Sequence, residues 1–124
     1  MTEQNDCVLI VDDDWMIADL WSMVLDDMGM RVCGPAATAE AAIKLAQAHR
    51  PSVVLMDVRL RGKVDGVDAA IAIRSLVGSR IIFVTGSREP ETVARMQTGQ
   101  PAAILSKPVS DQRLQAAIRA AMRN

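Results

Sequence analysis

The sequence predicts an α/β protein built on a doubly wound, five-stranded parallel sheet. Short apolar runs alternate with longer amphipathic segments five times along the chain. The apolar runs are continuous, which is typical of strands buried on both faces of a parallel sheet. The length of 124 residues suits one domain. We therefore expect residues 1–124 to form a single domain with helices on both faces of the sheet.

The first half of the chain contains three predicted strands and two helices. The strands are the apolar runs at residues 7–11, 31–34 and 53–56. The first helix carries an apolar stripe at i, i+3, i+4, i+7 spacing that starts at Ile17 and stops before Gly29. Thr38 is a suitable cap for the second helix, which runs to about Arg50 because Pro51 cannot continue it.

The second half contains two further strands and three helices. The strands are the runs at residues 81–84 and 102–105. The third helix carries Val67 and ends at Gly78. The fourth begins at Pro90 and ends at Gly99, and its shortage of large apolar residues predicts that it is the least firmly packed helix. Ser110 caps the last helix.

Composition excludes several classes of protein. The net charge is −1 and Tyr is absent, which argues against a nucleic-acid or membrane-surface binder. The first residues lack the pattern of a signal peptide, and no apolar run is long enough to span a membrane, so we predict a cytoplasmic protein. Cys7 and Cys33 lie in apolar stretches without metal-type spacing, which predicts buried, reduced thiols.

Polar residues follow four of the predicted strands and should meet at one edge of the sheet, where ligands bind to such folds. They are Asp12, Asp13 and Asp14; Asp57; Thr85 and Gly86; and Ser106, Lys107 and Pro108. Carboxylates 4 Å apart repel by about 4 kcal/mol at an effective dielectric near 20, so the cluster must raise its pKa values or recruit a cation. Mg²⁺ suits an all-oxygen site, and Lys107 adds a positive charge for an oxyanion.

Such a site is suited to phosphoryl transfer with a carboxylate as nucleophile. In order and spacing, these motifs, with Asp65 and Gly66, resemble the receiver domain of two-component response regulators over essentially the whole chain. The resemblance implies a flavodoxin-like (βα)5 fold with strand order 2-1-3-4-5. Asp14 also suits the N-cap of the first helix, so capping and metal binding remain equal alternatives for it.

The resemblance also assigns roles to individual residues. Asp57 would be the phosphoacceptor, and Thr85 and Lys107 would bind the phosphoryl oxygens. The Lys107–Pro108 bond would be cis, which fixes the direction of the lysine. The ligands of Mg²⁺, or Mn²⁺, would be the carboxylates of Asp12, Asp13 and Asp57 and the carbonyl of Arg59.

The same resemblance implies partners and a switch. A histidine kinase or histidine phosphotransfer protein would donate the phosphoryl group, and the domain would assist its own phosphorylation and dephosphorylation without being an enzyme for a separate substrate. A downstream protein would bind the face of the fourth helix, fifth strand and fifth helix. Thr85 and Ile104 would switch, although the family usually carries Tyr or Phe at the latter position. Arg59 and Ser87 would tune the phosphoryl lifetime.

Two alternatives remain open at this point. A pseudo-receiver would bind partners without phosphate, but the complete set of acids, threonine and lysine argues against it. A small phosphatase of the haloacid dehalogenase type also forms an aspartyl phosphate. That family requires Asp-x-Asp-x-Thr/Val on the first strand, which Met16 does not satisfy, and this chain has little room for a substrate cap.

Overall fold

The computed structural model describes residues 5–123, in which five strands and five helices alternate. The strands are β1 (Asn5–Val11), β2 (Arg31–Ala36), β3 (Pro51–Met56), β4 (Arg80–Thr85) and β5 (Ala103–Ser106). The helices are α1 (Trp15–Asp27), α2 (Ala39–His49), α3 (Gly66–Val77), α4 (Pro90–Thr98) and α5 (Asp111–Arg123). The predicted alternation is confirmed.

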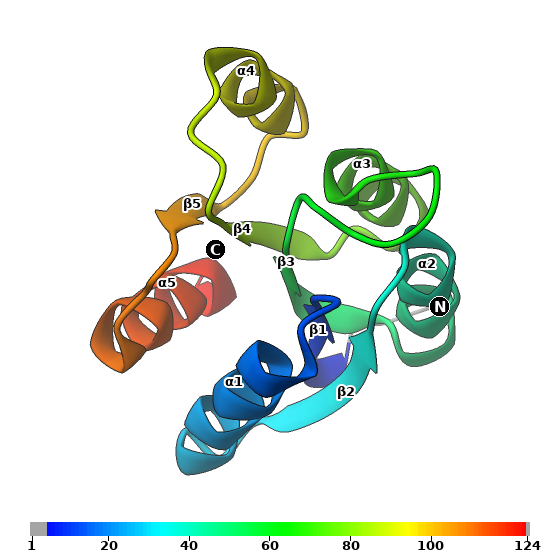
Figure 1. The fold of residues 1–124 in the computed structure, drawn as a ribbon. Helices are drawn as coiled ribbons and strands as arrows, with labels where there is room; N and C mark the ends of the chain where they lie inside the picture. The colour runs from blue at the N-terminus through cyan, green and yellow to red at the C-terminus, as the bar shows by residue number, and fades with distance from the viewer. Residues whose placement is uncertain (1–4, 124) are drawn as a thin grey trace.

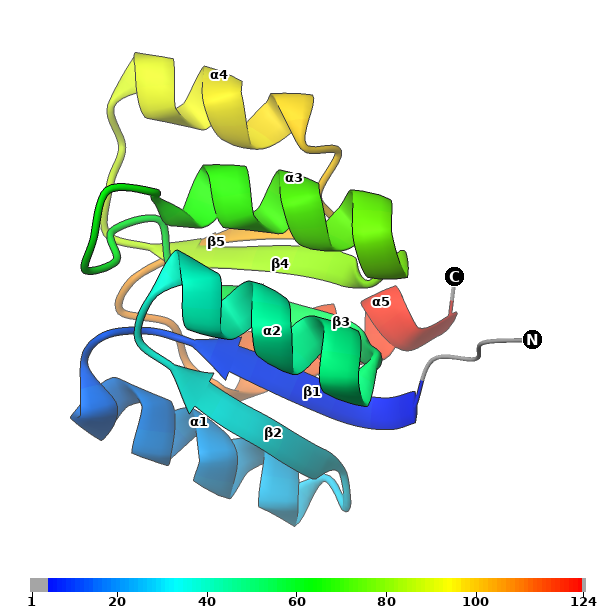
Figure 2. The ribbon, with the colours of Figure 1, turned by 90° about the vertical axis from the view of Figure 1, so that its right-hand side faces the viewer.

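All neighbouring strands are parallel, and their order is β2-β1-β3-β4-β5. Helices α1 and α5 lie on one side of the sheet, and α2, α3 and α4 lie on the other (Figure 1). The carboxyl ends of the strands and the loops that follow them lie at one edge (Figure 2). The predicted doubly wound fold and its strand order are therefore confirmed.

The central strands are buried on both faces, which explains their continuous apolar sequences. In β1, Leu9 and Val11 pack in the layer beneath α2 and α3, while Val8 and Ile10 pack in the layer beneath α1 and α5. All four side chains are fully buried. A one-sided sheet would require alternating polar residues at these positions.

The helix ends follow the local sequence signals. Asp14 caps α1 by accepting hydrogen bonds from the backbone N–H groups of Met16 (3.0 Å) and Ile17 (3.4 Å). Thr38 caps α2 through the N–H of Ala41 at 3.1 Å. These contacts satisfy amide donors that have no partner within the helix. Capping is thus the role that the structure gives Asp14.

Several details differ from the sequence prediction. Strand β1 begins at Asn5 rather than residue 7, β4 is one residue longer at each end, and β5 lies one residue later. Strand β2 extends past residue 34 to Ala36, because Ala36 pairs with Val11 across a register shift. Strand β3 begins at Pro51 rather than residue 53, since Arg50 turns the chain directly out of α2 with φ 48°. Leu20 belongs to the apolar stripe of α1 but is 59% exposed, so the stripe is wider than the face covered by the sheet.

Helix α4 is the most weakly anchored helix, as predicted. Met96 is its only buried residue, whereas each of the other four helices buries at least three. Among residues 5–123, no helix is both long and apolar enough to cross a membrane.

Candidate functional site

Two backbone hydrogen bonds fix the acidic residues at the carboxyl edge of the sheet. The N–H of Asp12, just after β1, donates to the carbonyl of Ala36 at 3.0 Å. The N–H of Asp57, just after β3, donates to the carbonyl of Val11 at 2.9 Å. Each residue therefore continues the sheet ladder for one step, and its side chain leaves the sheet in a defined direction.

Three carboxylates meet at this edge. Asp12, Asp13 and Asp57 each offer an oxygen, and these atoms lie within 4.8 Å of one another. Asp12 and Asp57 are only 2% and 6% exposed. Because water screens them poorly, their mutual repulsion is strong and a cation is needed between them.

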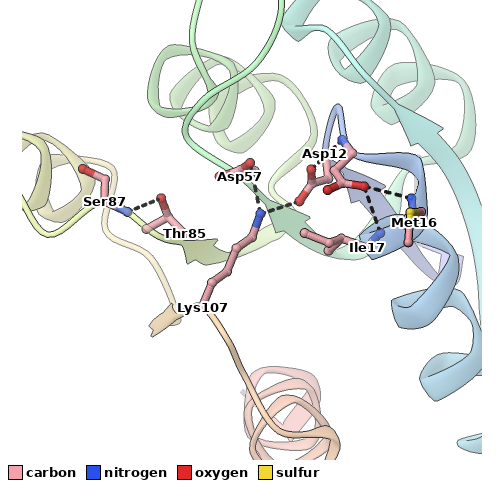
Figure 3. A network of polar contacts seen from close by, with 8 residues as sticks. Asp12, Met16, Ile17, Asp57, Thr85, Ser87 and Lys107 are labelled. Atoms are coloured by element: carbon pink, nitrogen blue, oxygen red, sulfur yellow. Dashed lines mark hydrogen bonds and ion pairs between the residues drawn. The ribbon is translucent and has the colours of Figure 1, made fainter.

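Lys107 supplies one such cation. Its Nζ atom lies 2.8 Å from Oδ2 of Asp12 and 3.2 Å from Oδ2 of Asp57, so it points between the two carboxylates (Figure 3). The backbone N–H of Lys107 donates to the carbonyl of Thr85 at 2.9 Å, and the bond to Pro108 is cis. Nζ also lies 5.6 Å from the ring centroid of Trp21, within the range of a cation–π contact.

Burial and charge shift the ionisation of this cluster. Burial raises the pKa of the Asp57 carboxyl, an effect that Lys107 partly opposes and Asp12 reinforces. Burial lowers the pKa of Lys107, but its contacts with Asp12 and Asp57 outweigh burial, so the pKa rises overall. The ammonium form of Lys107 is therefore favoured beside a carboxyl whose proton affinity is increased.

The hydroxyl of Thr85 completes the edge. Thr85 is buried at the end of β4, and its Oγ1 accepts a hydrogen bond from the N–H of Ser87 at 3.1 Å (Figure 3). Gly66 lies against the backbone of Asp57, where a Cβ atom would collide with the Asp57 carbonyl. A residue with a side chain therefore does not fit at this position beside the site.

The donor set fits a hard divalent cation. Three carboxylates converge without a cysteine or histidine among them, and oxygen ligands of this kind are preferred by Mg²⁺ and Mn²⁺. Lys107 already neutralises part of the cluster through its contacts with Asp12 and Asp57. Among the ion pairs of residues 7–123, none includes Asp13. An acidic cluster with an ammonium at its side is suited to bind a metal and a phosphoryl group together.

A comparison with protein families agrees with this geometry. The family model for the response regulator receiver domain matches residues 8–119. This chain belongs to that family. Membership of this family explains both the fold and the acidic edge of the sheet. The resemblance inferred from the sequence motifs is confirmed.

Relatives of this receiver domain include bacterial regulators. It is 33% identical to the transcriptional regulatory protein PdtaR of Mycobacterium tuberculosis over 83% of this chain and 50% of the relative. It is 34% identical to the response regulator UvrY of Escherichia coli over 90% of this chain and 52% of the relative. The chain therefore spans about half the length of the curated relatives that it matches.

A solved structure has the same fold and a related sequence. The signal receiver domain of a modulated diguanylate cyclase from Desulfovibrio desulfuricans is 33% identical, with a TM-score of 0.90. The alignment covers 94% of this chain and 93% of that one. The chain is therefore a receiver domain in its fold as well as in its sequence.

The structure places the predicted tuning residues around the receiver site. The guanidinium of Arg59 lies 3.7 Å from the carboxylate of Glu89, at the start of α4, rather than among the acids. The backbone of Arg59 forms a hydrogen bond that favours the ionised Asp57. Ile104 pairs with Phe83 in the sheet and packs, half-buried, against the core.

Two residues near the receiver site carry contacts that the sequence did not reveal. Trp21 lies under the ammonium of Lys107, although its position on an apolar stripe predicted only a core role. Arg95 in α4 contacts the Asp65 carboxylate through two nitrogens at 2.7 and 3.1 Å. The Asp65–Gly66 motif marked one partner, but no local pattern linked it to an arginine 30 residues away.

Proposed function

We propose that Asp57 accepts a phosphoryl group from the phosphohistidine of a histidine kinase or a histidine phosphotransfer protein. Family membership supports this role, because receiver domains act with these partners in two-component systems. The observation that carries the proposal is the convergence of three carboxylates and the Lys107 ammonium at one edge of the sheet. That arrangement offers a nucleophile and the charge needed to receive an oxyanion.

Exposure favours Asp57 over Asp12 as the nucleophile. The Asp12 side chain is 0% exposed, and its two oxygens accept hydrogen bonds from Lys107 and from the N–H of Asp14 at 2.8 Å each. The Asp57 side chain is 9% exposed. A phosphodonor therefore has access to Asp57, while Asp12 is held in place to serve as a ligand.

The proposed transfer is a displacement at phosphorus. A carboxylate oxygen of Asp57 forms the new P–O bond, the P–N bond to the donor histidine breaks, and its electron pair leaves on the imidazole nitrogen. Lys107 balances the charge of the phosphoryl oxygens. The Thr85 hydroxyl turns from the Ser87 amide to donate to one of them. Mg²⁺ bound to Asp12, Asp13 and Asp57, with the Arg59 carbonyl, would supply further positive charge at the transferred group.

The same residues suggest how phosphorylation reaches a partner. Thr85 immediately precedes the loop to α4, and its hydroxyl bond to Ser87 helps to shape that loop. Recruitment of Thr85 by the phosphoryl group would break this bond and shift α4. The face of α4, β5 and α5 would then present a different surface to a downstream protein. Ile104 would repack in this change without offering a ring or hydroxyl to the partner.

The test is phosphorylation by acetyl phosphate with Mg²⁺, followed by the mass of the intact protein. We expect a gain of one phosphoryl group in the wild type, none in Asp57→Asn, and none after chelation of the metal. Asp26→Asn, an exposed carboxylate on α1, is the matched control and should be modified normally. No gain in the wild type would favour a pseudo-receiver, and an equal gain in Asp57→Asn would reject Asp57 as the acceptor.

A further inference from the structure

Two buried thiols face each other in the sheet, away from the acid site. The Sγ atoms of Cys7 in β1 and Cys33 in β2 are 3.7 Å apart, and neither residue is in a disulfide. Both side chains are at least nine-tenths buried. They come together only because β2 pairs with β1, so their spacing of 26 residues carries no signal in the sequence.

The thiols line a pocket that opens to the surface. The pocket has a volume of about 490 Å³, and its walls include Gly34, Pro35, Leu45 and His49 as well as both cysteines. The Cys7 thiol lies 3.8 Å from the carbonyl of His49. Burial, together with Cys7, raises the pKa of the Cys33 thiol to about 12. The pocket thus gives a small ion a route to the two sulfurs, and the Cys33 thiol binds its proton more firmly than an exposed cysteine does.

The two sulfurs could be joined by a disulfide bond or by a bridging metal ion, and the strand register decides between them. Cys7 pairs with Arg31 and Cys33 pairs with Leu9, so the two cysteines are diagonal neighbours. Parallel strands lie about 4.8 Å apart and rise about 3.3 Å per residue, so diagonal Cα atoms are about 8 Å apart, whereas a disulfide requires about 4.4–6.8 Å. A disulfide would therefore require the edge strand β2 to shift along β1.

A bridging metal fits the observed distance without such a shift. Two Zn–S bonds of about 2.3 Å at a tetrahedral angle place the sulfurs about 3.8 Å apart. The observed separation is 3.7 Å. Sulfur ligands favour soft cations, Zn²⁺ among them, over Mg²⁺, which prefers oxygen.

We propose that Cys7 and Cys33 form a two-thiolate site for a soft d¹⁰ cation of the Zn²⁺ and Cd²⁺ class. Each thiol loses its proton to solvent as its sulfur binds the metal, and the remaining coordination positions face the pocket. The site is independent of Asp57 and of the proposed phosphorylation. Because it joins β2 to β1, and Ala36 of β2 holds the backbone of Asp12, metal binding would brace the strand beside the acid site.

The test is a titration of the reduced, metal-free protein with Cd²⁺. Excess Mg²⁺ is present throughout, so that the carboxylates are already occupied. We expect an ultraviolet thiolate-to-metal charge-transfer band that saturates at one Cd²⁺ per chain, and a higher Tm in the saturated protein. The affinity should rise with pH, because binding releases two protons.

Variants separate this site from adventitious binding. Cys7→Ser and Cys33→Ser should each weaken Cd²⁺ binding by at least about 100-fold, since loss of a second-shell partner alone costs 10–100-fold. Cys33→Ala keeps an apolar side chain in the core, and circular dichroism checks that each variant is folded. Lys44→Met, which removes an exposed charge on α2, is the control and should retain the band.

Three results would overturn the proposal. They are the absence of a charge-transfer band in the wild type, equal affinity in the folded single-cysteine variants, and rapid formation of an intramolecular disulfide by glutathione disulfide. The last result would show that the diagonal pair closes without the barrier inferred from the register.

Discussion

Compared with helix α4, the acid site is held by buried and directional contacts. Asp12 and Asp57 are fixed by backbone hydrogen bonds to the sheet, and Lys107 joins them at 2.8 and 3.2 Å. Helix α4 has one buried side chain, Met96, and a partly buried one, Val93, and ion pairs at the surface tie it to α3 and the loop before α3.

This difference assigns separate tasks to the two regions. Preorganised charges suit a reaction in which positioning and neutralisation are the main requirements. Exposed ion pairs stabilise weakly, and helices with few buried contacts open at low free-energy cost. The proposed chemistry thus occurs on a rigid edge, while the element that would report it is easily displaced.

The largest expected effect follows the removal of the central cation. Lys107→Met keeps an unbranched apolar stem but leaves Asp12 and Asp57 facing each other. Without metal, we expect a loss of about 2–3 kcal/mol in the free energy of unfolding, because a partly buried ion pair loses one partner. Mg²⁺ should bind about 10-fold more tightly, since the competing ammonium is gone.

Urea unfolding with and without Mg²⁺ measures both effects. Lys44→Met, an exposed lysine in α2, is the matched control and should change neither quantity. If Lys107→Met were as stable as the wild type without metal, the ammonium would not be what holds the carboxylates together, and the acid site would be less rigid than its contacts imply.

The second prediction concerns the one buried side chain of α4. Met96 is fully buried against the core on the α2–α3 side of the sheet. Met96→Ala should cost about 2–4 kcal/mol, because it removes apolar contacts and leaves a cavity. Amide hydrogen exchange should rise first in α4 and only slightly around Asp12.

Met23→Ala provides the contrast, because Met23 on α1 is exposed and its truncation leaves no cavity. We expect little change in stability for that variant. If hydrogen exchange in Met96→Ala became faster across the whole molecule, α4 and the acid site would unfold as one unit. Helix α4 would then not be more easily displaced than the acid site.

The fold was predictable because its signals are local. Continuous apolar runs mark strands buried on both faces, and Asp14 and Thr38 mark helix starts by their own capping bonds. The boundaries of β2 and β3 were less accurate because they depend on pairing between strands. Leu20 illustrates a similar limit, since helical periodicity does not state how much of an apolar stripe the sheet will cover.

The acid site was predictable because strand ends converge in a parallel sheet, so residues that follow different strands could be grouped before their distances were known. The contacts that modify the acid site were not predictable from the sequence. The contact of Trp21 with Lys107 and the pairing of Cys7 with Cys33 depend on side-chain directions across elements. The ion pair from Arg59 to Glu89 likewise required the position of α4.

The smallest expected effect comes from the ion pairs of α4. The bidentate hydrogen bond from Arg95 lowers the pKa of Asp65, whose carboxylate also caps α3 through the N–H of Asp68 at 3.1 Å. A lowered folded-state pKa stabilises the protein above the unfolded pKa, and this stabilisation is lost as the pH falls through the folded pKa. Arg95→Ala should therefore lower the Tm slightly at pH 7, and the difference from the wild type should shrink below about pH 4.

Exchange at the α4 amides should become a few-fold faster in Arg95→Ala at neutral pH, while exchange around Asp12 stays unchanged. Arg119→Ala, an exposed arginine on α5, controls for the loss of charge. A Tm difference that persisted unchanged in acid would show that Arg95 acts through packing rather than through Asp65. In that case the ion pairs of Arg95 would not contribute to the stability of α4, and its packing contacts would hold it in place.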